Sequence, residues 1–442
     1  MSQQTVLHIG FDDTDSPKGM CTTYLAFKIV DILRKENVEF LDYPRLIRFN
    51  PNIPWKTRGN GAVGLSIKTN EPDKIKQKVK HMVKSYSDTK NGANPGLIFY
   101  QNNTIPKDFA SFSELALWKL ISRSFAKEFV SKNNLESFYL GNGQGLVGAV
   151  GAIGYSFSDR TFELLSYRKK KQFGKKRQII PQSVRIMQEK THPYTFNSYD
   201  KKTGRVLITP RGPDPVFYGV RGEDPKTVVD ASKLIQTNEK LDGYLVFKTN
   251  QGTNDHLKNN LDSSALKPYT SGIISGIVSS KPKIEKGGHV FFSLTTKDYK
   301  INCAVYRQTK ITIVALELAV GDEVCVGGGI RKASKKYNRT LNVEFIEILK
   351  LEKHYKMINP LCINCNKTMK SKGKNQGFEC LKCESRAYKK IRTEIPRKIE
   401  PKLYVPAVTA HRHLTRPLQR IGKTGYDTRI SKSIPWFRIF EN

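Results

Sequence analysis

Four cysteines near the end of the chain restrict its fold more than any other feature. Cys362 and Cys365 are separated by two residues, fourteen residues follow, and Cys380 and Cys383 repeat the two-residue spacing. Four thiolates complete the tetrahedral shell of one Zn²⁺ ion and leave no position for a reactive water molecule. The spacing therefore predicts a closed, structural zinc site in a small ribbon over residues 358–390, in preference to a redox dithiol.

The rest of the composition indicates a soluble protein with several domains. The chain has 442 residues, of which 38% are hydrophobic, and its other cysteines, Cys21, Cys303 and Cys325, are isolated. Isolated thiols favour a reducing compartment over a disulfide framework. No window of about 18 apolar residues occurs, and the first residues lack signal-peptide character. We therefore expect a cytoplasmic protein without membrane contact; the sequence leaves its oligomeric state open.

A net charge of +35 requires a polyanionic partner. Residues 354–442 alone contain 20 Lys and Arg against 6 Asp and Glu, and seven cations occur between Arg168 and Arg177. No basic amphipathic helix with a strong apolar face accompanies them, which favours nucleic acid over a membrane. Within the second cluster we select Lys169 and Lys175 as RNA-binding candidates.

Three carboxylates crowd a loop near the start of the chain. The apolar strand Thr5–Phe11 leads directly into Asp12, Asp13 and Asp15, and a helix follows from about residue 24. Such carboxylates repel one another unless a cation such as Mg²⁺ lies among them, and the free N–H groups of the helix can bind phosphate. We expect Thr22 or Thr23 to cap that helix.

Two Gly-rich turns extend this pattern. Arg58 and Asn60 lie in a turn before the apolar strand 62–67, and residues 91–96 form a second turn. No P-loop sequence occurs, so an ATP site must be of another type. We expect Arg58 to stabilise the charge that develops during the reaction. The candidate phosphate-binding residues are Ser16, Gly19, Thr23, Gly59, Asn60, Gly61 and Asn94.

The order of expected elements predicts an α+β multidomain chain. Residues 1–125 alternate strands and helices in a kinase-like, ferredoxin-like order, and residues 126–265 form a second ferredoxin-like α+β region of the same module. We expect one long helix over about 113–130. Small residues at helical spacing over 141–154 indicate a closely packed helix or a backbone that passes near a ligand.

The pattern of expected elements changes to short strands over residues 268–352. Five strands in about 80 residues predict an OB-fold β-barrel that binds single-stranded nucleic acid. His289, Tyr306 and Arg307 are its candidate RNA-binding residues, and strand alternation places either Phe291 or Phe292 in the core. The basic segment 391–442 is expected to lie along RNA or another domain.

Several motifs occur in a fixed order over nearly the whole chain. They are DDTDSPKGMCTTYL (12–25), PRLIRFNPNIPWKTRGNGAVG (44–64), NGANPG (91–96), GLVGA (145–149), PVFYGVRGE (215–223), GGHVFF (287–292) and the four cysteines. With them the chain closely resembles the archaeal tRNA-Ile 2-agmatinylcytidine synthetases, the TiaS family.

The resemblance implies an ATP-dependent ligase that attaches agmatine to the wobble cytidine of a CAU anticodon in tRNA-Ile, so that AUA is read as isoleucine. It also implies that the base is activated by phosphorylation, that the threonine matching Thr22 is itself modified, and that AMP is released. ATP, Mg²⁺ and Zn²⁺ are the implied cofactors. From charge complementarity to agmatine we select Glu223 and Asp255, with Arg221 beside them, although Arg221 also suits phosphate or RNA.

Two other classes of protein stay open from the residues alone. A non-catalytic single-strand binder would explain the charge and the barrel but leaves the acidic loop without a role. An RNA ligase or nucleotidyltransferase would attack with a lysine, for which Lys56 is a loose match. On either enzymatic reading, we expect ATP binding to survive removal of residues 354–442.

Overall fold

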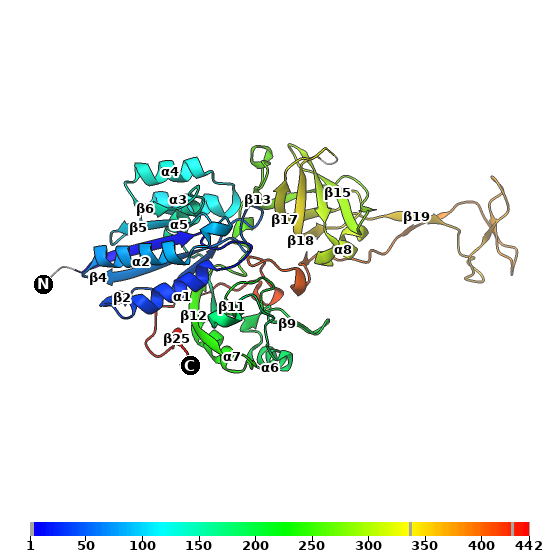
Figure 1. Ribbon diagram of the computed structural model, residues 1–442. Helices are drawn as coiled ribbons and strands as arrows, with labels where there is room; N and C mark the ends of the chain where they lie inside the picture. The colour runs from blue at the N-terminus through cyan, green and yellow to red at the C-terminus, as the bar shows by residue number, and fades with distance from the viewer. Residues whose placement is uncertain (1–3, 336–337, 426–427, 442) are drawn as a thin grey trace.

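The computed structural model describes residues 4–335, 338–425 and 428–441. It has an α+β module at one end, a barrel beside it and a thin lobe at the far end (Figure 1). The predicted α+β multidomain class is confirmed. No described helix is both long enough and apolar enough to cross a membrane.

A single mixed sheet runs through the whole α+β module. Its order is β6 (Glu136–Tyr139), β5 (Gly96–Gln101), β1 (Thr5–Asp12), β4 (Gly61–Thr69), β3 (Arg45–Arg48), β12 (Leu241–Thr249), β7 (Thr161–Arg168), β11 (Val216–Gly222) and β8 (Thr195–Phe196). In addition, β2 (Val38–Phe40) pairs with β4, and β25 (Phe437–Ile439) pairs with β12. The parallel pairing of β3 with β12 joins the two regions that the sequence predicted within one module.

Helices cover this sheet in two groups. One hydrophobic cluster includes α1 (Thr22–Leu33), α2 (Pro72–Tyr86), α6 (Pro181–Thr191) and α7 (Pro225–Lys233). A second cluster joins α3 (Lys107–Trp118), α4 (Arg123–Lys132) and α5 (Gly145–Gly154). A small hairpin of β9 (Tyr199–Asp200) and β10 (Arg205–Val206) stands beside α6.

The expectation of one long helix over 113–130 is wrong. The chain forms α3 and α4 instead, because residue 119 is extended and Ser122 starts the new helix by accepting a hydrogen bond from the Phe125 N–H. The small-residue segment 141–154 does form a closely packed helix. A Cβ on Gly10 of β1 would lie 2.1 Å from the Ala149 carbonyl oxygen of α5, so only glycine permits this approach.

The five expected barrel strands close on one another. They are β13 (Ser271–Val278), β15 (His289–Thr295), β16 (Lys300–Val305), β17 (Glu323–Arg331) and β18 (Thr340–Lys350). β13 pairs with both β15 and β17, and a parallel β16–β18 pairing completes the ring; β14 (Lys283–Glu285) and α8 (Thr312–Glu317) are additions. Phe292 is in the core and Phe291 is half-buried, as strand alternation predicted.

A two-stranded stalk leads from the barrel to the cysteine lobe. β19 (Tyr355–Ile358) carries the chain outward and β23 (Ile391–Glu394) brings it back (Figure 1). Between them, β20 (Lys370–Ser371), β21 (Phe378–Glu379) and β22 (Arg386–Ala387) form a small sheet.

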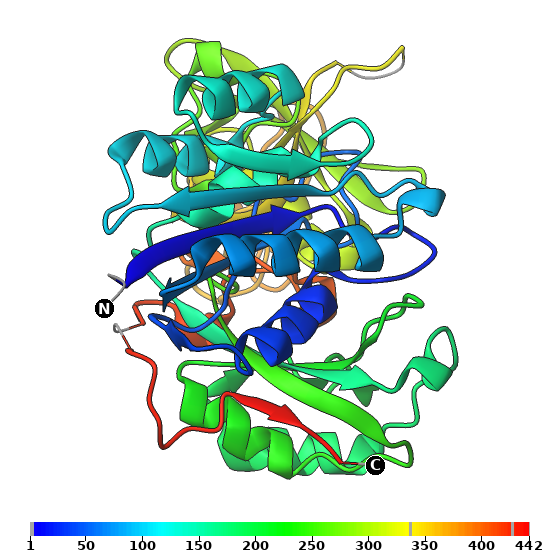
Figure 2. The ribbon, with the colours of Figure 1, turned by 60° about the vertical axis from the view of Figure 1, so that its left-hand side comes forward.

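The chain then returns to the α+β module. β24 (Leu403–Tyr404) pairs with β18 of the barrel, and β25 pairs with β12 near the C-terminus, beside α7 in Figure 2. We call residues 403–441 the return segment. Of the two expectations for the predicted basic tail 391–442, contact with other domains is therefore confirmed for the described residues; residues 426, 427 and 442 lie outside them.

Candidate functional site

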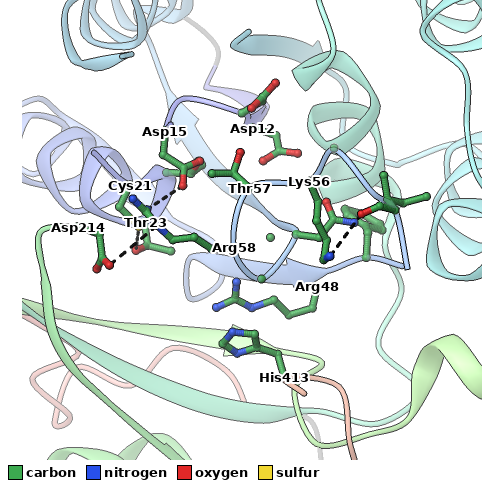
Figure 3. Close-up of a pocket in the computed structure, with 18 of the residues that line it drawn as sticks. Asp12, Asp15, Cys21, Thr23, Arg48, Lys56, Thr57, Arg58, Asp214 and His413 are labelled. Carbon is green, nitrogen blue, oxygen red and sulfur yellow. Dashed lines mark hydrogen bonds and ion pairs between the residues drawn. The ribbon is translucent and has the colours of Figure 1, made fainter. Parts of the chain in front are cut away.

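A cavity of about 300 Å³ opens where the two halves of the sheet meet the return segment. Its lining comes from the end of β1, the start of α1, β3, the turn before β4, β7, β11 and residue 413. In Figure 3, Asp12 and Asp15 lie on one side of the turn that carries Arg58, and Arg48 and His413 lie on the other. The pocket thus has an acidic side and a basic side.

The acidic side lacks positive charge to match its carboxylates. Burial, reinforced by Asp13, raises the pKa of Asp12 well above its ordinary value. Burial and the nearby Asp15 raise the pKa of Asp13 to about 7, and burial raises that of Asp15 to about 6 even though Arg58 opposes the shift. Nearby carboxylates with this deficit are groups that a divalent cation can stabilise, although the three oxygens do not converge on one point as the four cysteine sulfurs of the ribbon do.

Arg58 ties the Gly-rich turn to the acidic loop. Its Nη1 donates to Asp15 Oδ2 at 2.8 Å and to the Met20 carbonyl at 2.8 Å, and its Nη2 donates to the Ser16 carbonyl at 3.1 Å. Arg58 and Asn60 both have left-handed backbones, with φ of 46° and 49°. Such strained conformations at non-glycine residues concentrate at functional sites.

The expected threonine cap of α1 is wrong. The N-cap residue is Cys21, which makes no side-chain capping bond, and both threonines lie inside the first turn. Thr22 Oγ1 instead accepts a hydrogen bond from Thr14 Oγ1 at 3.1 Å, because both hydroxyls are buried together. No side chain therefore caps the first N–H groups of the helix, and the residues at this helix start, Cys21, Thr22 and Thr23, line the pocket, where an anion can bind.

Glu163 organises the basic side. Its carboxylate is buried, accepts from Arg221 Nε at 2.9 Å and lies 3.8 Å from Arg48 Nη2. Gln251 Nε2 donates to the same carboxylate, and Gln251 Oε1 lies 2.7 Å from His413 Nδ1. Two arginines against one carboxylate leave a net positive charge on this wall of the pocket.

The predicted site residues fall into two sets. Those lining the pocket are Asp12, Asp13, Asp15, Thr22, Thr23, Arg58, Gly59, Asn60, Gly61 and Arg221. Ser16 and Gly19 bond each other in the adjoining turn, and Asn94 accepts from the Asn142 N–H. The structure does not bring Glu223 and Asp255 to the pocket, because Arg420 pairs with Glu223 while Tyr155 and Lys258 hold Asp255.

The RNA-binding candidates are also divided. His289 and Tyr306 stack edge to face with ring centroids 4.9 Å apart, and the exposed Arg307 donates its backbone N–H to His289. They form one group on the barrel surface. Lys175 is exposed, but Lys169 lies 3.6 Å from Asp242 and donates to the Phe440 carbonyl, so part of the basic cluster is structural.

The ribbon places its four cysteines as the spacing predicted. One ligand atom from each of Cys362, Cys365, Cys380 and Cys383 lies within 4.8 Å of the others. Met369 and Phe378 pack with them in a small core. Four converging sulfurs without another side chain in the group fit a closed tetrahedral Zn²⁺ site.

Sequence reasoning missed most of the basic side and the carboxylate of Asp214 near Arg58. Arg48, Glu163, Asp214 and His413 line the pocket but belong to no spacing motif. Arg48 lay within a quoted motif, and its strand position after two apolar residues was the available signal. His413 had no local signal, because it is brought in from the return segment.

An α+β module with this pocket, joined to a closed barrel and a four-cysteine ribbon, defines a multidomain nucleic-acid-modifying enzyme. Three family models match: the TiaS TCKD domain over residues 8–142, the TiaS FLD domain over 143–256 and the TiaS C-terminal zinc ribbon domain over 359–399. The chain belongs to the family of tRNA-Ile 2-agmatinylcytidine synthetases, TiaS.

Relatives and solved structures agree with this assignment. The chain is 46% identical to the TiaS synthetase of Cenarchaeum symbiosum, with 99% of this chain and 98% of the relative covered. It resembles the solved complex of TiaS with its isoleucine tRNA and ATP with a TM-score of 0.84 and 32% identity, covering 96% of this chain and 99% of that one. For the complex of TiaS with the same tRNA, AMPCPP and agmatine, the TM-score is 0.81 and the identity 31%, with the same coverage.

Proposed function

We propose that the protein is an ATP-dependent ligase that joins agmatine to C2 of the wobble cytidine in the CAU anticodon of tRNA-Ile. The observation that carries this proposal is one pocket that combines an acidic loop, a helix start without a side-chain cap and an arginine-rich wall. Its relatives of known structure contain an isoleucine tRNA with ATP, or with AMPCPP and agmatine, and match nearly the whole chain. The product reads AUA as isoleucine.

The chemistry requires the base to be activated first. The oxygen at C2 of cytidine is a poor leaving group, so an amine can replace it only after that oxygen is converted into a better one. Phosphorylation by ATP supplies a phosphate ester, and the amine then displaces phosphate. That phosphoryl transfer leaves ADP, and transfer of a second phosphoryl group from ADP to a hydroxyl of the protein would leave AMP. Thr22, which lines the pocket, is our candidate acceptor.

The pocket residues divide this work between them. Asp12, Asp13 and Asp15 would hold Mg²⁺, which neutralises triphosphate charge when bound. The first turn of α1 and the Gly59–Gly61 turn bind phosphate oxygens. Arg58 orients the acidic loop, and Arg221 contacts phosphate from the opposite wall.

The other domains hold the RNA. We assign residues 268–352 as an OB-fold, because the third and fifth strands of the barrel pair in parallel and α8 lies between the third and fourth. We propose that His289, Tyr306 and Arg307 of the barrel and the exposed Lys175 of the α+β module contact the RNA, and that the ribbon contacts it as well. The wobble base must leave its stack to enter the pocket. Because its substrate serves translation, we place the enzyme in the cytoplasm.

One assay tests the proposal directly. The protein is incubated with ATP, Mg²⁺, agmatine and a CAU-anticodon tRNA, and the wobble nucleoside is analysed by mass spectrometry. The expected mass gain is that of agmatine less one water. An unmodified cytidine under conditions that consume ATP would refute the proposal. A tRNA with a different wobble base is the matched control.

A further inference from the structure

His413 reaches the pocket from a distant part of the chain. It lies in the return segment, after the barrel and the ribbon, and its ring faces the turn before β4 (Figure 3). A Cβ on Gly59 would lie 2.7 Å from His413 Nε2, so this nitrogen points at the Gly-rich turn. The role of an imidazole here depends on which nitrogen carries the proton.

The neighbours of His413 select one tautomer. Gln251 Nε2 donates to the Glu163 carboxylate, which fixes Gln251 Oε1 as the atom facing His413. That oxygen lies 2.7 Å from Nδ1, a distance that requires a proton between them, so Nδ1–H donates. Arg221 Nη2, also a donor, lies farther from Nδ1 at 3.1 Å and is already held to Glu163 through its Nε. Nε2 therefore carries a lone pair.

That lone pair lies beside the Gly59 turn at the pocket wall. Within residues 4–335, 338–425 and 428–441, Nε2 has no hydrogen-bond partner, whereas Nδ1 has close polar neighbours. The charged groups packed around the ring are Arg48 from β3, Glu163 from β7 and Arg221 from β11. Burial and the two arginines lower the pKa of His413 well below its ordinary value, so the ring is neutral at neutral pH.

The proposed reaction needs such a group. A primary amine that bonds to carbon must lose a proton, and the described carboxylates of the pocket are otherwise engaged. Those of the acidic loop would hold Mg²⁺ in the proposed function, Glu163 lies beside Arg221 and Arg48, and Asp214 lies 3.4 Å from Arg177. The arginine wall also repels an ammonium ion, which favours the uncharged, nucleophilic form of an amine beside Nε2.

We propose that His413 Nε2 accepts the proton that the amine loses as it attacks the activated cytidine; this inference rests on the proposed function. The amine nitrogen bonds to C2, the C2–O bond breaks, and phosphate leaves with the electron pair. The proton passes from nitrogen to Nε2, and the resulting imidazolium, disfavoured beside two arginines, returns it to water. Glu163 and Gln251 are positioning residues in this scheme, because they act through His413.

Two substitutions separate this role from a structural one. In His413→Asn, the side-chain amide can still donate to Gln251, but the acceptor at the Nε2 position is gone. In His413→Ala, free imidazole can occupy the vacated space. The matched control is His411→Asn, two residues earlier in the same segment, whose ring contacts Asn197 and Pro406 outside the pocket.

For His413→Asn we expect single-turnover transfer of agmatine to fall about 10²- to 10⁴-fold, the range for losing a general base. ATP affinity and the thermal midpoint should stay near wild type. The wild-type rate should level off above the low pKa of His413, whereas the variant's rate should keep rising with pH. Added imidazole should partly restore His413→Ala, and His411→Asn should transfer agmatine within about twofold of wild type.

Two results would overturn the inference. One is wild-type turnover and pH profile in His413→Asn. The other is a parallel loss of ATP affinity and thermal stability without imidazole rescue of His413→Ala, which would make the histidine structural. If the wild-type enzyme itself fails to transfer agmatine, the proposed function is refuted and this inference falls with it.

Discussion

Arg420 anchors the return segment, and its replacement by alanine should destabilise the α+β module. The guanidinium is completely buried. Its Nη2 donates to Asp159 Oδ1 at 2.9 Å, its Nε to Glu223 Oε1 at 2.8 Å, and its Nη1 to the Gly252 carbonyl at 2.7 Å. Nη1 and Nη2 also donate to Asp159 Oδ2 and to the Arg160 carbonyl. Arg420→Ala removes all of these bonds at once, takes this partner from Glu223 and leaves Asp159 with Arg416 as its arginine partner.

The size of the effect follows from that burial. Removing one member of a buried ion pair costs about 3 to 5 kcal/mol, most of it from the uncompensated charge left behind. For a unit of this size, about 2 to 4 °C of melting temperature is lost per kcal/mol, so the midpoint should fall by about 6 to 20 °C. Differential scanning calorimetry measures it, and Trp436, buried where the segment ends, reports the same transition by fluorescence.

The loss of stability in Arg420→Ala should also depend on pH. Burial on its own raises the pKa of Asp159, but Arg420 and its neighbours override it and hold the pKa below its ordinary value. Because the folded pKa is below the unfolded value of about 3.9, the stabilisation is complete above that pH and is lost as pH falls through the folded pKa. The gap between wild type and variant should therefore be full at pH 7 and narrow below about pH 4.

Lys423→Ala is the matched control, since it removes the same charge from an exposed position in the same segment. It should melt within about 1 °C of wild type, as surface substitutions do. Equal midpoints for Arg420→Ala and Lys423→Ala, or a gap that does not change between pH 7 and pH 3.5, would refute the reasoning.

Three further predictions follow from the site and the domain arrangement. Asp12→Asn should abolish ATP consumption while tRNA affinity in a filter-binding assay stays within about twofold, because we propose that this carboxylate holds Mg²⁺ and does not contact RNA; turnover near wild type would contradict the assignment. Cys365→Ser should release about one zinc per chain, measured by atomic emission, and loosen only the ribbon; a purified protein without zinc would show the site to be something else. Deleting the ribbon, residues 359–392, should reduce the slope of log affinity for tRNA against log salt by about 0.7 to 0.9 per lost phosphate contact and leave ATP binding intact. Truncation after residue 402 should impair ATP binding as well. Equal ATP affinity in both proteins would refute a role for the return segment at the pocket.

The last of these revises an expectation drawn from the sequence. Removal of residues 354–442 was expected to spare ATP binding, because the phosphate-binding turns all lie before residue 100. In the structure, however, His413 lines the pocket and Arg420 lies buried against residues of the α+β module. The segment is thus part of the module, although the chain reaches it only after the barrel and the ribbon.

Local chemistry made part of the protein predictable from sequence alone. The zinc ligands are set by a spacing within 22 residues, and Asp12, Asp13 and Asp15 are adjacent in the chain, so they crowd one loop in any fold that keeps the strand and helix around it. Strand alternation likewise decided that one of two neighbouring phenylalanines is in the barrel core. These features depend on bonds and periodicities of a few residues.

Only the tertiary structure decided which other side chains these residues contact. Arg58 reaches Asp15 across 43 positions, and Gln251 reaches His413 across 162, and no periodicity relates such residues. Thr22 is a further case. Threonine often caps helices, but here its buried hydroxyl accepts a hydrogen bond from Thr14 instead. A side chain's partner depends on which surfaces the sheet and the return segment bury together, and that is set by the packing of the entire chain.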